Sequence, residues 1–240
     1  MKQVAYCGTR RIYDDMETAA KSLIANGCID RVHFFIEDAE FPRPLPDVIQ
    51  CHDVSGQDYF KPGTPNMESD FTYMAMMRIA LCHELKDVDR VLSLDCDTIV
   101  TRDLSALWDI QLDNYYLSST PEWHRSKNGL QYCNFGVVLY NLDKMRDGKS
   151  DECIKVLNRR KFTWVEQDVG NYLCQGRIHE MPPEYNANYW TIKDFFNLPS
   201  KSRQDLARIV HYAGIKDFHR YDEWKEYAAM NWDEVMRAHG

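Results

Sequence analysis

The chain has 240 residues, 44% of them hydrophobic, and its 37 acidic and 29 basic side chains give a formal charge of −8. This length predicts one large domain or two small ones, and 30 aromatic side chains (14 Tyr, 10 Phe and 6 Trp) exclude an intrinsically disordered chain. The acidic balance argues against a general nucleic-acid binder, which needs a cationic face, but it allows a small anionic ligand at one local site.

The chain begins with strand and helix patterns in alternation. Residues 4–7 form a short apolar run that predicts a buried strand, and residues 32–36 predict the next one. Between them, Asp14 and Asp15 offer N-cap oxygens to a helix that Gly27 can end. A strand, a helix and a strand in this order predict a parallel sheet with crossover helices.

The rest of the chain continues the same alternation after a loop. Residues 41–65 contain five prolines and predict mostly loop, although 48–51 could add a strand. Apolar patterns then predict strands over 90–94, 115–118 and 135–139 and helices over 73–85, 151–158 and 167–174. The last forty residues show little strand pattern. The simplest interpretation is one α/β domain.

Neither a membrane span nor a cysteine framework is indicated. The first six residues lack the apolar core of a secretory signal, and no apolar run approaches the ~18–20 residues that cross a bilayer. Eight cysteines are scattered without a Cys-x-x-Cys pair, so we expect reduced thiols and neither a zinc site nor a disulfide scaffold. These observations predict a cytoplasmic protein without a transmembrane segment.

The best single candidate site follows the apolar run at 90–94. Asp95 and Asp97 come directly after this predicted strand, and in open α/β sheets ligands bind beyond the carboxyl ends of strands. In an extended chain the two carboxylates would point the same way. Together they could bind a hard divalent cation that bridges phosphates. The alternative is an acidic turn, because Asp favours turns through local hydrogen bonds.

The same two residues allow a competing enzyme class. An Asp-x-Asp after a strand also resembles the opening motif of the haloacid-dehalogenase phosphatases, in which the first Asp is a covalent nucleophile. That motif normally follows the first strand of its domain, whereas about ninety residues precede Asp95 here. A later Asp-Asp metal pair is not evident either, so this alternative is disfavoured.

Five sequence blocks carry a family resemblance. They are VLSLDCDTIV at 91–100 (continuing to 110), NFGVVLYNL at 134–142, EQDVGN at 166–171, MPPEYN at 181–186 and HYAGIK at 211–216. In this order they resemble the motifs of glycosyltransferase family eight, which includes bacterial lipopolysaccharide galactosyl- and glucosyltransferases and glycogenin. The resemblance covers residues 4 to about 224.

The resemblance implies a fold and an activity. The fold is a single GT-A type catalytic domain over 1–240, with a Rossmann-like, mostly parallel central sheet flanked by helices. Its nucleotide-binding half would span 1–100 and its sugar and acceptor half 101–240. The implied activity is a retaining hexosyltransferase that moves glucose or galactose from a UDP-sugar to a glycan or other hydroxyl acceptor.

The resemblance also implies how the donor diphosphate is held. Asp95, Asp97 and His211 would bind Mn²⁺, with Mg²⁺ as an alternative, and the imidazole favours Mn²⁺ over the oxygen-seeking Ca²⁺. Lys216 would contact the diphosphate as a point charge. Gly214 would let the backbone approach the phosphates closely.

Further positions match the sugar end of the family's site. Arg78 and Asn134 would contact the donor, and Glu166 and Gln167 would lie nearest the reacting carbon. Because glutamine is a poor nucleophile, a front-face mechanism is expected, in which the leaving phosphate oxygen helps to deprotonate the acceptor and Gln167 stabilises the cationic sugar. The family usually has Asp where this chain has Glu166.

The nucleoside and acceptor ends match less closely. Ala5 and Tyr13 correspond to positions of the family's nucleoside pocket, but the acidic residue expected between them is missing. Asn186 and Trp190 are predicted on the acceptor side, because aromatic faces stack on sugars. A catalytically silent sugar-nucleotide-binding relative and a nucleotidyltransferase remain alternatives to the hexosyltransferase.

Overall fold

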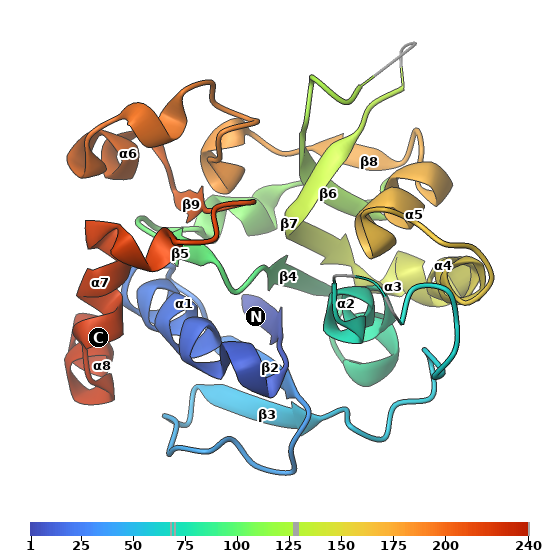
Figure 1. The fold of residues 1–240 in the computed structure, drawn as a ribbon, viewed down its shortest axis with the longest axis horizontal. Coiled ribbons are helices and arrows are strands. Elements are labelled where there is room, and N and C mark those ends of the chain that lie inside the picture. Colours follow the sequence, from blue (N-terminus) through green and yellow to red (C-terminus); the bar gives the residue numbers. More distant parts are fainter. Residues whose placement is uncertain (68, 70, 127–129, 240) are drawn as a thin grey trace.

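The structure is a computed structural model that describes residues 1–67, 69, 71–126 and 130–239. Its centre is a seven-stranded sheet with the strand order β3-β2-β1-β4-β7-β6-β8, and β5 pairs with β9 in a second, two-stranded sheet (Figure 1). The strands are β1 (Gln3–Cys7), β2 (Arg31–Ile36), β3 (Ile49–Asp53), β4 (Arg90–Leu94), β5 (Thr98–Val100), β6 (Leu117–Pro121), β7 (Cys133–Asn141), β8 (Ile178–Glu180) and β9 (Ile209–His211).

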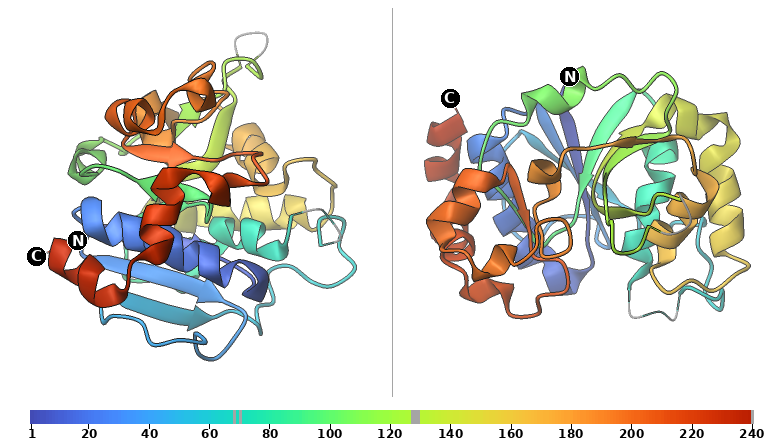
Figure 2. Two further views of the ribbon diagram at one scale, coloured as in Figure 1. Left: turned by 60° about the vertical axis from the view of Figure 1, so that its left-hand side comes forward. Right: turned by 90° about the horizontal axis from the view of Figure 1, so that it is seen from above.

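Helices cover both faces of the central sheet. They are α1 (Tyr13–Asn26), α2 (Tyr73–Glu84), α3 (Leu142–Lys144), α4 (Ser150–Leu157), α5 (Val165–Leu173), α6 (Ser200–Leu206), α7 (Asp222–Ala229) and α8 (Trp232–His239). Figure 2 shows the sheet edge-on between two helical layers, with α1, α7 and α8 on one side and α2, α4 and α5 on the other. The predicted Rossmann-like α/β architecture is confirmed.

Most of the pairings are parallel, as predicted. Parallel pairings join β3, β2, β1 and β4, and also β6 and β8. Strand β7 is the exception, because it runs antiparallel to both β4 and β6. The beginning of β7 therefore lies at the same edge of the sheet as the carboxyl ends of β4 and β6, which brings distant parts of the chain together there.

Apolar burial explains why the first strands and helices form. Met16, Leu23 and Ile24 recur at helical spacing in α1 and are fully buried against the sheet. The start of this helix differs from the prediction. The helix begins at Tyr13 with the apolar Ile12 at the N-cap position, so Asp14 lies in the first turn, where a carboxylate favours the positive end of the helix dipole.

Three short strands, one of them in the last forty residues, lie where the sequence pattern does not predict a strand. Strands β5, β8 and β9 are three residues each, too short for a period of two to show. Strand β9 pairs with β5 so that His211 lies opposite Thr98. A further apolar cluster of Phe195, Tyr212 and Trp224 packs around this small sheet.

Two expectations about the chain as a whole concern thiols and membranes. All eight cysteines are free, and six of them are buried, where they pack as small apolar side chains. In the part of the chain that the structure describes, no helix is long and apolar enough to cross a membrane.

A histidine pair in β2 and β3, of which His33 is buried and His52 half-buried, makes the stability of the fold depend on pH. His33 is 3% exposed, with Nδ1 2.9 Å from Nε2 of His52 and Nε2 2.7 Å from Oε1 of Gln3. Burial, together with the neighbouring His52 and Arg31, lowers the pKa of His33 to about 4. The folded state therefore resists protonation that the unfolded chain accepts at about pH 6.5.

We expect acidification from pH 7.5 to pH 5 to remove about 1–2 kcal/mol of unfolding free energy through this residue. A depressed histidine pKa contributes stability above the unfolded pKa, and that stability is lost as the pH falls toward the folded value. Urea unfolding at several pH values should show a flatter dependence for His33→Gln than for the unchanged chain. Equal slopes would contradict the assignment.

Candidate functional site

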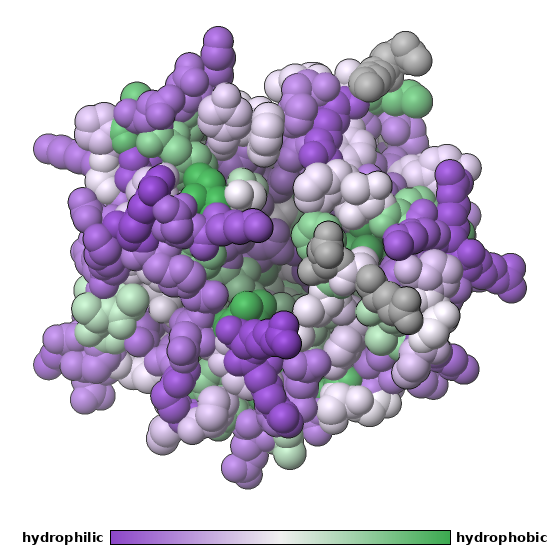
Figure 3. Space-filling view, in the orientation of Figure 1, coloured by the Kyte–Doolittle hydropathy of each residue, from purple (hydrophilic) through white to green (hydrophobic). Residues whose placement is uncertain are grey.

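A cavity of about 330 Å³ opens at the edge of the sheet where β4 and β6 end and β7 begins. Figure 3 shows the hollow near the centre of this face. Its walls come from the β4–β5 turn, the start of β7, the start of α5 and the segment after β9. Residues from both halves of the chain line it: Phe71, Ala75, Asp95, Asp97, Glu122, Arg125, Asn134, Phe135, Gly136, Trp164, Val165, Glu166, Gln167, Trp190, His211, Ala213 and Gly214.

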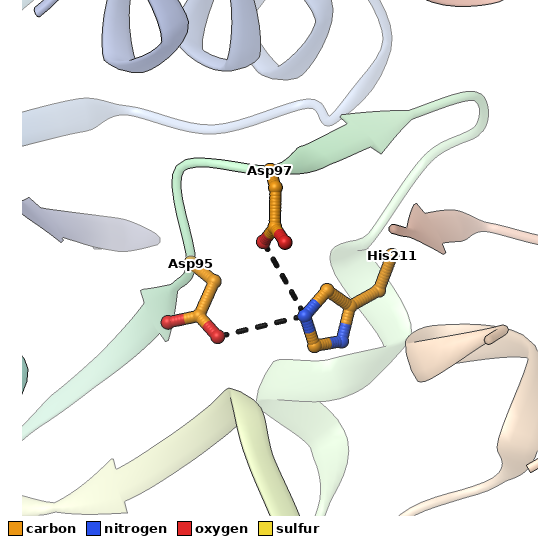
Figure 4. Close-up of side chains that lie close together, drawn as sticks. All are labelled: Asp95, Asp97 and His211. Atoms are coloured by element: carbon orange, nitrogen blue, oxygen red, sulfur yellow. Dashed lines mark ion pairs between the residues drawn. The ribbon is translucent and has the colours of Figure 1, made fainter. Parts of the chain in front are cut away.

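Two carboxylates and an imidazole converge in this cavity. Nε2 of His211 lies 3.5 Å from Asp95 Oδ2 and 3.4 Å from Asp97 Oδ1, and Figure 4 shows both carboxylates turned toward the ring. The chain turns at residues 95–97 and does not stay extended, yet the two side chains still meet. Two carboxylate oxygens and a nitrogen within 4.8 Å of one another form a donor set that fits a divalent cation.

The electrostatics of the three groups favour positive charge between them. Burial would lower the pKa of His211, but Asp97 and Asp95 raise it to about 10. Burial would likewise raise the pKa of Asp95, but Arg78 and His211 lower it. The Asp95 carboxylate therefore stays ionised near neutral pH, which is the form that ligates metals.

Gly136, the glycine of the NFG block, lies against two residues of the triad. The ring of His211 lies directly over this residue, so a Cβ added here would lie 2.6 Å from both ring nitrogens. The carbonyl oxygen of Gly136 also accepts the backbone N–H of Asp95 at 2.8 Å. Gly136 therefore contacts both His211 and Asp95. Only a residue without a side chain allows the ring to lie this close to the backbone.

Arg78 lies beneath the cavity and does not line it. The guanidinium is 3% exposed and contacts the Asp95 carboxylate, the backbone carbonyl of Phe135 and, at 3.4 Å, Glu166 Oε1. Its neighbours are therefore protein groups, whereas the resemblance implied a donor contact. The buried guanidinium of Arg78 thus joins the end of β4, the start of β7 and the start of α5.

Glu166 and Gln167 lie side by side at the start of α5. Burial, partly opposed by Arg78, raises the pKa of Glu166 to about 7. The Gln167 amide is fixed at both ends, since its Oε1 accepts the Phe135 N–H at 2.9 Å and its Nε2 donates to the Tyr132 hydroxyl at 3.0 Å. Both residues line the cavity.

Asn134 lines the cavity within a network that includes an acid missed by the sequence analysis. Its Nδ2 donates to Oε1 of Glu122 at 2.7 Å, and Glu122 is 2% exposed. The other oxygen of Glu122 lies 3.0 Å from Nε of Arg125. Glu122 follows the carboxyl end of β6, so the strand-end rule that selected Asp95 could also have selected it.

Aromatic side chains surround the mouth of the cavity. Trp190 is 47% exposed and stacks on His124 at 4.7 Å between ring centroids. The ring centroids of Trp164 and Phe71 lie 5.5 Å apart, and the Arg125 guanidinium lies 4.5 Å from the Trp164 ring centroid. These exposed faces suit the apolar side of a sugar ring.

The remaining predicted residues lie outside the cavity wall. Ala5, Tyr13, Lys216 and Asn186 are not among the described residues that line it. Ala5 is buried in β1, the Tyr13 hydroxyl donates to Asp38, and Lys216 is exposed. Asn186 is fully buried, with its side chain bonded to His211, so the structure does not bring it to an acceptor surface. Gly214 does line the cavity, at a φ of +77° that glycine favours.

Sequence comparison gives one family. The sequence model described as glycosyl transferase family 8 matches residues 39–220. Glycosyltransferase GlyA of Streptococcus pneumoniae serotype 4 is 28% identical over 92% of this chain and 32% of its own length. Glycosyltransferase GlyB of the same organism is 25% identical over 70% of this chain and 45% of its own length. The chain thus spans less than half of these two relatives.

Solved structures share the fold. Glycosyltransferase GlyE of Streptococcus pneumoniae superposes with a TM-score of 0.71 at 21% identity, covering 98% of this chain and 62% of GlyE. The galactosyltransferase LgtC, solved in complex with donor and acceptor sugar analogues, superposes with a TM-score of 0.67 at 20% identity, covering 98% of this chain and 99% of LgtC. These similarities confirm the predicted GT-A type fold.

Proposed function

The chain belongs to glycosyltransferase family 8, and on this premise we propose that it transfers glucose or galactose from a UDP-sugar to a hydroxyl group of a glycan or another acceptor. We propose that the transfer uses Mn²⁺, or Mg²⁺ less well, and retains the anomeric configuration. The observation that carries the proposal is the meeting of Asp95, Asp97 and His211 in one cavity with Glu166 and Gln167.

The metal ligands fit the leaving group of such a donor. A divalent cation held by Asp95, Asp97 and His211 would neutralise the diphosphate and act as a Lewis acid. Gly214 supplies backbone without a side chain at the cavity wall, and Lys216 follows two residues later. In this proposal residues 1–100 form the nucleotide-binding half, with His211, Gly214 and Lys216 contributed to the diphosphate from the second half, and residues 101–240 otherwise hold the sugar and the acceptor.

Gln167 supports a front-face reaction. An amide is a poor nucleophile, and both ends of this one are already occupied by Phe135 N–H and the Tyr132 hydroxyl. Its fixed dipole would stabilise the positive charge that develops on the sugar. As the bond from the anomeric carbon to the phosphate oxygen breaks and the bond to the acceptor oxygen forms, the acceptor proton would pass to the leaving phosphate.

Glu166 and Asn134 would orient the donor sugar. Both line the cavity, and each is held by a neighbour: Glu166 by Arg78 beneath the cavity, and Asn134 by Glu122 in the cavity wall. Carboxyl and amide groups bind sugar hydroxyls as donors or acceptors. Because Glu166 is one methylene longer than the family's usual Asp, Glu166→Asp is expected to change the ratio of activities with UDP-glucose and UDP-galactose.

We expect UDP release from UDP-glucose or UDP-galactose to require a divalent cation and to be faster with Mn²⁺ than with Mg²⁺. Purified protein stripped with EDTA should lose the activity, and Mn²⁺ should restore it. Turnover that persists in EDTA would contradict the metal assignment. Analysis of the product by NMR, with simple sugars as acceptors, would then test retention of configuration.

The same material separates the two alternatives. A silent relative would bind UDP in a calorimetric titration yet hydrolyse no UDP-sugar. A nucleotidyltransferase would release diphosphate from a nucleoside triphosphate. Either result would replace the hexosyltransferase proposal, whereas UDP release from a UDP-sugar supports it against both.

A further inference from the structure

We infer that Asn186 is a positioning residue that fixes the tautomer and orientation of His211, an inference that rests on the proposed metal-dependent function. Asn186 ends the short helical turn η4 (Pro183–Asn186), and its side chain is fully buried. Its Oδ1 lies 2.7 Å from Nδ1 of His211. The resemblance suggested an acceptor-side role, whereas this contact points to the opposite side, behind the metal ligands.

The direction of this hydrogen bond follows from neighbouring groups that can act only as donors or only as acceptors. The backbone N–H of Gly136 can only donate, so the atom of Asn134 that it contacts at 2.9 Å must be the amide oxygen. At the other end of the same side chain, the Nδ2 of Asn134 faces the carboxylate of Glu122 at 2.7 Å. The orientation of the Asn134 amide is therefore set from both sides.

Asn134 in turn orients Asn186. The Asn134 oxygen can only accept, so Asn186 must present its NH₂ group there, at 2.9 Å. The Asn186 oxygen is then left for His211 and for a second donor, Nδ2 of Asn188, at 3.0 Å. An amide oxygen accepts hydrogen bonds and cannot donate, so the nitrogen of His211 that faces it carries the proton.

The consequence lies on the other side of the imidazole ring. With a proton held on Nδ1 by Asn186, Nε2 is the ring nitrogen that faces Asp95 and Asp97, from which it lies 3.5 and 3.4 Å away, and its lone pair becomes available when a cation takes the place of the proton there. This is the tautomer that can ligate a cation there, and metal-binding histidines are commonly fixed by such a partner on the second nitrogen.

The backbone keeps the two partners in register. Ala187 donates its N–H to the carbonyl of Ile209 at 2.9 Å, and the N–H of His211 donates to the carbonyl of Ala187 at 2.9 Å. The segment that carries Asn186 therefore runs beside β9 as an additional pairing partner. The MPPEYN block and the HYAGIK block act in this way as one unit.

We expect Asn186→Leu, which keeps a similar size but cannot accept a hydrogen bond, to weaken Mn²⁺ binding about 10- to 100-fold. Electron paramagnetic resonance of free Mn²⁺, titrated into the purified chain without donor, measures this affinity. Asn141→Leu is the matched control, because Asn141 is also a buried asparagine, hydrogen-bonded to the carbonyl of Leu112 away from the triad. It should bind Mn²⁺ as the unchanged chain does.

The outcomes are distinguishable. If the unchanged chain binds Mn²⁺ and a folded Asn186→Leu variant binds it equally well, the positioning role is wrong and the proposed function stands. If the unchanged chain binds no Mn²⁺, the metal part of the proposed function fails and the inference fails with it. If Asn186→Leu does not fold, Asn186→Ala carries the same expectation, since it removes the same acceptor without adding bulk.

Discussion

Replacement of Asp97 by alanine is expected to lower metal-dependent UDP-sugar turnover by about 100- to 1,000-fold. Asp97 supplies one of the two carboxylates that face Nε2 of His211, at 3.4 Å. Without it the donor set is reduced to Asp95 and His211, and Asp95 already shares its charge with the buried Arg78. The measurement is UDP release over a range of Mn²⁺ concentrations.

The control for this substitution is an aspartate in another turn, the one that precedes β6. Asp113 is exposed and lies beside Asn141, the last residue of β7, whereas the cavity lies where β7 begins. Asp113→Ala should therefore leave turnover unchanged. Should Asp97→Ala keep full Mn²⁺-dependent turnover, the triad is not the metal site. Loss of turnover together with loss of the folded state would instead show a structural role, so thermal unfolding of both variants is measured alongside.

Gly136→Ala is expected to reduce Mn²⁺ affinity and turnover by about 100-fold or more while leaving the fold intact. The added methyl group would overlap the ring of His211, which must then move away from the two carboxylates. A displacement of about 1 Å in a catalytic group can cost about 100-fold in rate. The backbone of β7 needs no other change, because alanine is compatible with a strand.

Gly56→Ala is the matched control for this substitution. Nothing lies within 4 Å of a Cβ built at Gly56, so this variant should behave as the unchanged chain does. Mn²⁺ titration by electron paramagnetic resonance, with far-UV circular dichroism for the fold, decides between the outcomes. A Gly136→Ala variant with normal Mn²⁺ affinity would show that His211 can leave its position over Gly136 without loss of metal binding.

Much of the fold could be predicted because apolar periodicity is strong in its central elements. The run at 90–94 coincides with β4, and the pattern at 73–85 differs from α2 by one residue. The two aspartates after β4 were found by a general rule about strand ends, without knowledge of what lies opposite them. The family resemblance then supplied His211, which no local pattern connects to Asp95.

The rest could not be predicted because it depends on contacts between distant segments. Strand β9 has only three residues, and it pairs with β5, which lies more than 100 residues earlier in the chain. No local sequence pattern can show such a pairing. Likewise, the burial of Arg78 beneath the cavity follows from three elements meeting around it, whereas its helical position alone fits an exposed ion pair equally well. Glu122 was missed because the prediction ended the strand before it at residue 118, whereas β6 continues to Pro121.

The pairing of β5 with β9 also closes a long loop of the chain. Thr98 and His211 are opposite each other in this small sheet, so it joins the two ends of a loop of more than 100 residues. Closing so long a loop has an entropic cost that the three-residue strands must offset. A cation shared by Asp97 and His211 would act across the same junction, much as a cross-link does. Binding of the cation would therefore keep this loop closed as well as hold the donor. The free energy of cation binding would add to the free energy of folding.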